Sequence, residues 1–177
     1  MDAEVSRVLA DDYLHGLTSR PVPELRSLRA ECQAVETKLS YLRRLVQGRL
    51  DIVSGERQRR QAGGAPGDIA GLIERLPEIL SDRIRGPGTG RLPATFEPGE
   101  LSGTLVSRLN VIGDGNDADD EELHAAVIAL TELEGEVSSL RRAMFDRIDR
   151  IETELTARYR DGTANVDDLL SNGDSFT

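Results

Sequence analysis

The chain is poor in the residues that fill a thick globular core. It contains no tryptophan, three phenylalanines and three tyrosines, so aromatic residues make up only 3% of its 177 residues. Aromatic side chains dominate the energetics of most compact cores, and we therefore do not expect a core of that kind. The residues that are abundant, arginine, leucine, glutamate and alanine, are typical of long helices and coiled coils.

Cysteine is also scarce, and acidic residues outnumber basic ones. Cys32 is the only cysteine, which excludes an intramolecular disulfide and fits a reducing compartment. The net charge of −10 argues against binding to nucleic-acid polymers, which normally requires a basic surface, but it suits a basic protein partner. The segment Met1–Ala10 lacks a long apolar run, so we predict no signal peptide, no membrane span and a cytoplasmic location.

The sequence also lacks the common patterns of catalytic and metal-binding residues. His15 and His124 are far apart in the sequence and belong to no recognisable triad. The glycine-rich run at 86–90 lacks the lysine of a phosphate-binding loop, and the acidic run at 114–122 lacks the glycine placement of a calcium loop. We predict that the protein is not an enzyme and has no catalytic or metal-binding residues.

Two heptad seams predict two long helices, at 23–62 and 119–160. In each seam apolar residues recur at alternating steps of four and three, with one interruption, at Arg49 and at Arg147. The seam residues are Leu28, Cys32, Val35, Leu39, Leu42, Val46 and Val53 in the first helix, and Leu130, Leu133, Val137, Leu140, Met144 and Ile151 in the second. Neither helix can bury its seam alone, so we expect the two to pair.

The other segments are shorter and less regular. Residues 1–22 form an N-terminal segment with a short amphipathic patch, and residues 67–84 have the spacing of a short helix that Pro77 kinks or splits. Residues 85–118 are rich in Gly, Pro, Asp and Asn and are expected to be a linker without a long element, and 161–177 form an acidic tail. The predicted fold is all-α: an antiparallel two-helix coiled-coil hairpin with a short middle helix, a flexible linker and flexible tails.

Both long helices carry the same polar stripe. The first copy is Glu36, Ser40, Arg43, Gln47 and Asp51, and the second is Glu134, Ser138, Arg141, Phe145 and Asp149. The copies are 98 residues apart, which is fourteen heptads, so they have the same phase relative to the seams. A helix turns by about 100° per residue, so each stripe occupies an arc of roughly 80° beside its seam. Antiparallel pairing would relate the stripes by a pseudo-twofold axis, which favours a ligand with twofold symmetry.

The residue types in the stripes are suited to guanine. An arginine can donate a fork of hydrogen bonds to guanine O6 and N7, and a carboxylate can accept from N1–H and N2–H of the same base. Arg43 with Asp51, and Arg141 with Asp149, form such pairs of groups. The alternative is that both stripes are solvated faces with local ion pairs, on a structural coiled-coil adaptor without a small-molecule ligand.

The first stripe has the spacing E-x3-S-x2-R-x3-Q-x3-D, which resembles the signature of the RsiG family of actinobacterial anti-sigma factors. The resemblance implies that two such motifs on an antiparallel coiled coil bind a dimer of cyclic-di-GMP. It also implies that the ligand-loaded protein sequesters a sporulation sigma factor of RNA polymerase, WhiG or a relative, which is related to flagellar sigma factors. The second copy departs from the signature at Phe145, where glutamine is expected.

Overall fold

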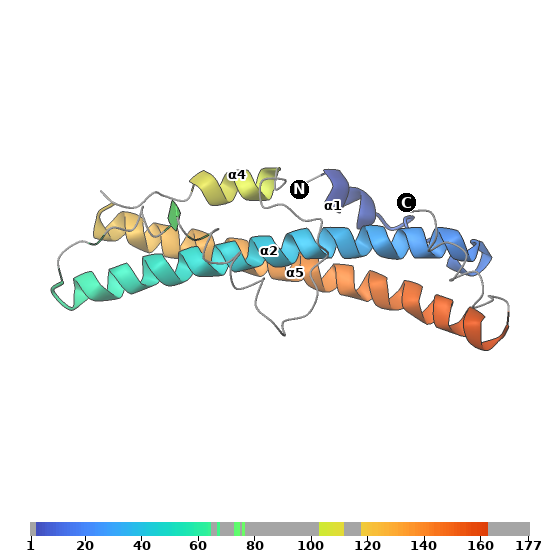
Figure 1. Cartoon of the computed structure of the whole chain (residues 1–177). Coiled ribbons are helices and arrows are strands. Elements are labelled where there is room, and N and C mark those ends of the chain that lie inside the picture. Colours follow the sequence, from blue (N-terminus) through green and yellow to red (C-terminus); the bar gives the residue numbers. More distant parts are fainter. Residues whose placement is uncertain are drawn as a thin grey trace, which may run out of the picture. The chain divides into compact units, whose positions relative to one another are not determined.

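The computed structural model describes residues 3–64, 67, 73–74, 76, 103–111 and 118–162, and these form helices and turns without a strand. The elements in chain order are α1 (Ala3–Val8), the 3-10 helix η1 (Leu17–Ser19), α2 (Val22–Gln61), α4 (Thr104–Val111) and α5 (Asp120–Arg160). The long helices α2 and α5 pair as a hairpin (Figure 1), so the predicted all-α hairpin is confirmed.

The chain divides into two compact units, and each contains part of both long helices. The first unit comprises Thr37–Arg141 together with Met1–Ala3, and the second comprises Glu4–Glu36 and Arg142–Thr177.

The heptad seams form the core of both units. Most predicted seam residues are at most 3% exposed: Cys32, Val35, Leu39, Leu42, Val46, Val53, Leu130, Leu133, Val137, Met144 and Ile151. Leu28 and Leu140, which were also predicted to lie in the seams, are only half-buried. Burial of these side chains stabilises both long helices, because most helix stability in proteins comes from the packing of an apolar face.

In the first unit α2 and α5 run antiparallel. Arg43 of α2 contacts Glu134 of α5, and farther along α2 Arg60 donates to the carbonyl oxygen of Ala118, just before α5 begins. Residue numbers therefore rise along one helix as they fall along the other. Leu76 packs against Gly48, where an added Cβ would lie 2.7 Å from a Leu76 methyl carbon, so a larger residue at position 48 would displace the Leu76 side chain.

In the second unit a hydrogen bond joins the start of α2 to the end of α5. Arg26, in the first turns of α2, donates to the hydroxyl of Tyr159 near the end of α5. Arg158 of α5 holds the turn before α2, because its guanidinium donates to the carbonyl oxygens of Leu17, at 2.8 Å, and Arg20.

The predicted linker contains one short helix in its described part. The segment 85–118, expected to be a linker without a long element, contains the eight-residue helix α4. Leu105 and Leu109 lie on one face of α4 and are at most 2% exposed, so tertiary packing stabilises a helix that is too short to be stable alone. Of the predicted helix at 67–84, Ile73, Glu74 and Leu76 are helical and Gly67 is not; the other residues of that segment, and the tail beyond Gly162, lie outside the described residues.

No helix in the described part of the chain is both long enough and apolar enough to cross a membrane.

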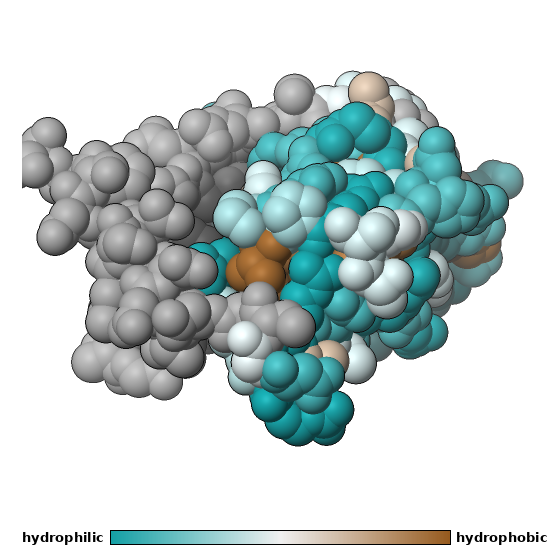
Figure 2. Space-filling model, turned by 90° about the vertical axis from the view of Figure 1, so that its right-hand side faces the viewer, coloured by the Kyte–Doolittle hydropathy of each residue, from teal (hydrophilic) through white to brown (hydrophobic). Residues whose placement is uncertain are grey.

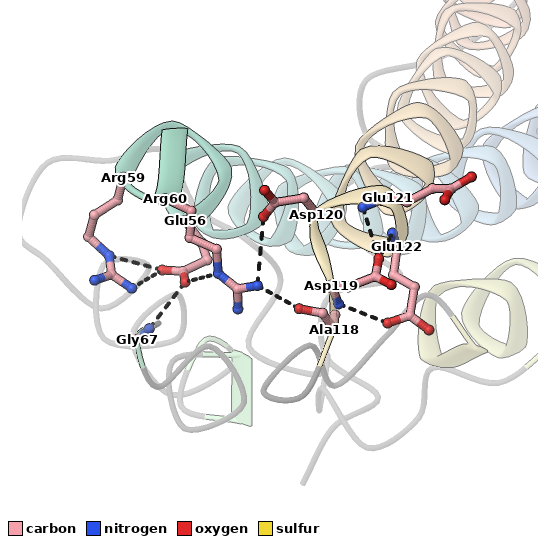
Figure 3. Close-up of polar contacts among 9 residues, drawn as sticks. All are labelled: Glu56, Arg59, Arg60, Gly67, Ala118, Asp119, Asp120, Glu121 and Glu122. Carbon is pink, nitrogen blue, oxygen red and sulfur yellow. Dashed lines mark hydrogen bonds and ion pairs between the residues drawn. The ribbon is translucent and has the colours of Figure 1, made fainter. Parts of the chain in front are cut away.

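A polar cluster joins the end of α2 to the start of α5 (Figure 3). Glu56, only 7% exposed, accepts hydrogen bonds from Arg59, from Arg60 Nε at 2.7 Å and from the backbone N–H of Gly67 at 3.1 Å. Arg60 also donates to the Ala118 carbonyl at 2.6 Å. At the start of α5 the Asp119 and Glu122 side chains cap the helix reciprocally, each accepting from backbone N–H groups at 2.9 Å.

This cluster predicts that the fold becomes less stable at acid pH. Hydrogen bonds from Arg59 and Arg60 lower the pKa of Glu56 from its ordinary value of 4.5 to about 2. Because the folded-state pKa is depressed, the stabilisation is present above pH 4.5 and is lost as the pH falls towards 2. We expect the thermal midpoint, measured by circular dichroism, to fall over this range, and to fall less in Glu56→Gln, which should already be less stable at pH 7.

The matched control is Glu132→Gln, which removes an exposed carboxylate from the middle of α5. It should follow the pH profile of the wild type. If the Glu56→Gln profile also ran parallel to that of the wild type, the hydrogen bonds to Glu56 would not account for the acid sensitivity.

Candidate functional site

The residues of the two stripes are distributed over both units. The first unit contains Ser40, Arg43, Gln47 and Asp51 from the first copy, and Glu134, Ser138 and Arg141 from the second. The second unit contains Glu36, Phe145 and Asp149. The two copies are therefore not separated by unit, and the first unit combines most of both.

In the first unit, residues of the two copies form one hydrogen-bonded cluster. Arg43 Nε donates to Glu134 Oε1 and to Ser138 Oγ, both at 2.8 Å. The same Glu134 oxygen accepts from Gln47 Nε2 at 3.1 Å and from Ser138 Oγ at 2.9 Å. We call Arg43, Gln47, Glu134 and Ser138 the cross-helix cluster, because α2 supplies its amide and its guanidinium and α5 supplies its carboxylate and its hydroxyl.

The geometry of the cluster follows from helical spacing. Gln47 is four residues after Arg43, and Ser138 is four residues after Glu134, so each pair lies on one face of its helix. Antiparallel packing brings these two faces together. Arg43 and Glu134 have side chains that are 34% and 23% exposed, so an ion pair that is partly screened by water holds the cluster at the flank of the hairpin.

The cluster orients a guanidinium. Both hydrogen bonds that Arg43 makes within the described part of the chain use Nε. The terminal amino groups of Arg43 are not engaged by those two bonds, and a guanidinium whose Nε is fixed presents its remaining donors in a defined direction. An acceptor pair such as the O6 and N7 edge of guanine, or phosphate oxygens, can bind donors of this kind.

A groove lies beside the cluster. It has a volume of about 460 Å³, and its described lining residues are Gln47, Leu50, Asp51, Thr131 and Glu134. This volume lies in the range of small-molecule sites. Asp51 is exposed at the groove, where its carboxylate can accept hydrogen bonds from a ligand. Ser40 and Arg141 are half-buried in the same unit and are not among the described lining residues.

In the second unit the stripe residues have a different environment. Glu36 is half-buried, and Phe145, where the signature has glutamine, is 41% exposed and so does not belong to the core. Asp149 lines two grooves of about 430 and 480 Å³. Residues of the segment after α1 form part of the wall of the larger one: Leu14, Gly16, Leu17 and Thr18. Sequence analysis missed this wall, because no spacing rule relates the N-terminal segment to α5.

Figure 2 shows one face of the molecule, on which hydrophilic residues predominate among the described residues and hydrophobic areas are small. The large hydrophobic residues with substantial exposure in the described part are Ile128, at 47%, and Phe145. Single exposed hydrophobic residues are common on soluble proteins, but an aromatic ring inside a polar stripe is a candidate for stacking on a base. No three His, Cys, Asp or Glu residues of the described ranges are grouped so that they could hold a metal ion.

Fold and site together place the chain among helical-hairpin proteins that carry a polar cluster across their paired helices. Residues 11–80 match the model of a family described as RsiG-like. This segment includes the whole first stripe, from Glu36 to Asp51, so the resemblance to RsiG is confirmed over these residues. The matched residues end before α4 and α5, so the match does not bear on the second stripe. A search of curated proteins finds no match to the chain.

The family match carries a broad functional meaning. It supports an anti-sigma factor role, which implies a sigma factor as partner, and this role is regulatory rather than catalytic.

Proposed function

We propose that this chain is a cyclic-di-GMP-dependent anti-sigma factor that, when loaded with ligand, sequesters a WhiG-like sigma factor and so represses a sporulation or flagellar-type transcription programme. The observation that carries the proposal is the cross-helix cluster. Arg43 and Gln47 from the first stripe hydrogen bond to Glu134 and Ser138 from the second, so a ligand held there would contact both helices and fix their geometry.

The two stripes supply complementary groups for two guanine-containing ligands. In the proposed complex the Arg43 and Arg141 guanidinium groups contact guanine O6 and N7 or the phosphates, and the Asp51 and Asp149 carboxylates accept from guanine N1–H and N2–H. The exposed ring of Phe145 stacks on a base where the first stripe offers the Gln47 amide. Glu36, Ser40, Glu134 and Ser138 complete the polar lining and orient the arginines.

The proposed partner explains the charge of the protein. Sigma factors have basic surfaces that contact DNA, and a chain with a net charge of −10 can occupy such a surface. RNA polymerase acts in the cytoplasm, and we place the protein there with its partner.

The experiment that tests the proposal is calorimetric titration of the purified chain with cyclic-di-GMP, with cyclic-di-AMP as the matched control. We expect saturable binding of about two cyclic-di-GMP molecules per chain and much weaker binding of cyclic-di-AMP, because an adenine edge presents a donor where guanine has O6. Equal affinity for both ligands would contradict guanine recognition.

A second candidate is a structural coiled-coil adaptor without a small-molecule ligand. The ion pair between Arg43 and Glu134 favours this candidate, because it joins the two helices without any ligand. Titration in the presence of a WhiG-like sigma factor separates the two candidates: if no cyclic-di-GMP binds with or without the sigma factor, the adaptor is the correct function.

A further inference from the structure

Two arginines interrupt the apolar seams, and neither belongs to a stripe. Arg49 in α2 and Arg147 in α5 are 98 residues apart, the same offset as the two stripes. Both are half-buried at positions where a heptad seam calls for an apolar residue. A charged group in a seam costs stability unless it is well paired, so its partners indicate what it does.

Each arginine holds the carboxyl end of a short helix. In the first unit Arg49 Nη1 donates to the Leu109 carbonyl in the last turn of α4, at 2.6 Å. In the second unit Arg147 donates to three successive carbonyls at the end of α1, those of Val8 and Leu9 at 2.7 Å and of Ala10 at 3.3 Å. The last carbonyls of a helix lack intrahelical partners and lie at its negative end, so a guanidinium there is stabilising. We call Arg49 and Arg147 the clamp arginines, and α1 and α4 the cap helices.

The two cap helices are alike in sequence and in their other anchors. Both contain the triplet Val-Ser-Arg, at residues 5–7 and 106–108. The arginine of each triplet forms an ion pair with a glutamate of the long helix that follows it, Arg7 with Glu31 and Arg108 with Glu136. Each helix also buries two apolar residues, which are Val5 and Val8 in α1 and Leu105 and Leu109 in α4. The same docking arrangement therefore occurs once in each unit.

A cap helix can be helical only while it is docked. α1 has six residues and α4 has eight, and isolated helices shorter than about 12 residues are marginal in water. Each cap helix thus has two states, a docked helix and an undocked coil, and its amide protection reports the balance between them.

The clamp arginines lie within the last spacer of each stripe. Arg49 is two residues from both Gln47 and Asp51, and Arg147 is two residues from both Phe145 and Asp149. Two residues correspond to roughly 200° around a helix. The stripe and the clamp are therefore on opposite sides of the same helical turn, and a ligand that orders this turn also orders the clamp.

We infer that Arg49 and Arg147 are positioning residues that couple docking of the cap helices to occupancy of the stripe. The coupling rests on the proposed function. A ligand that rigidifies the turn between Gln47 and Asp51 lowers the conformational entropy that α4 docking must still remove, so docking becomes more favourable. By linkage, docked cap helices raise ligand affinity by the same factor. Within each unit, ligand occupancy on the stripe face of a helical turn is thereby reported by the cap helix that the clamp arginine of that turn holds.

Hydrogen exchange by mass spectrometry on the full chain, with and without saturating cyclic-di-GMP, tests this inference. We expect the ligand to slow exchange of the α4 amides several-fold in the wild type. Arg49→Leu, which restores an apolar residue to the seam, should speed α4 exchange about tenfold without ligand, since it removes a hydrogen bond from a charged group. It should leave α1 exchange unchanged and weaken cyclic-di-GMP binding several-fold.

The control is Arg57→Leu, which removes a half-buried guanidinium from α2 that makes no hydrogen bond to the described residues; it should leave α4 exchange unaltered. Equal α4 exchange in Arg49→Leu and wild type would overturn the clamp. Calorimetry on the same samples separates the remaining claims. Binding without any change in α4 exchange would overturn the coupling alone, whereas absence of binding by the wild type, alone and with the sigma factor, would overturn the proposed function and the coupling with it.

Discussion

Replacing Arg43 by alanine should weaken cyclic-di-GMP binding by about 100-fold in calorimetric titration. A bidentate contact between arginine and guanine contributes about 1–3 kcal/mol, and each 1.4 kcal/mol is tenfold in affinity. The substitution also removes the cation whose Nε donates to Glu134 and to Ser138, each at 2.8 Å, so the carboxylate would face the anionic ligand without its counter-charge.

The effect of this substitution on folding should be much smaller. The Arg43 and Glu134 side chains are 34% and 23% exposed, and ion pairs of that kind contribute about 0–1 kcal/mol to stability. A thermal melt of Arg43→Ala should therefore stay close to that of the wild type, which separates loss of binding from loss of structure.

The matched control for this prediction is the adjacent Arg44→Ala. Arg44 is exposed and takes no part in the hydrogen bonds of the cross-helix cluster, so its removal changes the net charge equally but leaves the cluster intact. It should cost less than threefold in affinity, through long-range attraction of the phosphates only. If Arg43→Ala and Arg44→Ala lowered affinity equally, the effect of Arg43 would be one of net charge and not of recognition.

Much of the fold follows directly from the heptad spacing. The alternation of three- and four-residue steps fixes which face of α2 and α5 is apolar, and two such faces in one chain must be buried together. α2 accordingly begins at Val22 and ends at Gln61, within one residue of the predicted limits. A long periodic pattern is informative because each repeat adds independent evidence for the same face.

α4 could not be recognised in the same way. Its eight residues contain one pair of buried apolar positions, Leu105 and Leu109, and a single i,i+4 pair occurs often by chance. The surrounding Gly- and Pro-rich sequence also favours a linker. A usable signal was nevertheless present, because the Val-Ser-Arg triplet of α4 repeats that of α1, and each triplet precedes one of the two long helices.

The site was predictable in its residue types but not in its pairings. Spacing alone shows that Arg43 and Gln47 share a face, as do Glu134 and Ser138. That the carboxylate of Glu134 meets Arg43 depends on the register in which the helices slide past one another, and many registers satisfy the same heptads. The roles of Arg49 and Arg147 could not be predicted for a related reason. The sequence shows that an arginine interrupts each seam, but it does not show which carbonyl groups the arginine binds.

The largest effect on stability should come from Leu133→Ala. Leu133 is fully buried in the α5 seam of the first unit, and Leu→Ala at such positions costs about 2–5 kcal/mol, from lost transfer free energy and from the cavity that remains. For a chain of this size that corresponds to a fall of roughly 4–20 °C in the thermal midpoint measured by circular dichroism. Ile128→Ala, in the same helix and unit but at a position that is 47% exposed, should change the free energy of unfolding by less than about 0.5 kcal/mol.

This pair of variants also tests the orientation of α5 on which the site depends. If α5 were rotated about its axis, Ile128 would enter the interface, Leu133 would leave it, and the two costs would be reversed. Glu134 follows Leu133 directly and is presented to Arg43 only when Leu133 points into the seam. A large loss for Leu133→Ala with almost none for Ile128→Ala would therefore fix the face of α5 that carries the second stripe, and Leu133→Ala should weaken cyclic-di-GMP binding as well, because a loosened seam separates the two halves of the cross-helix cluster.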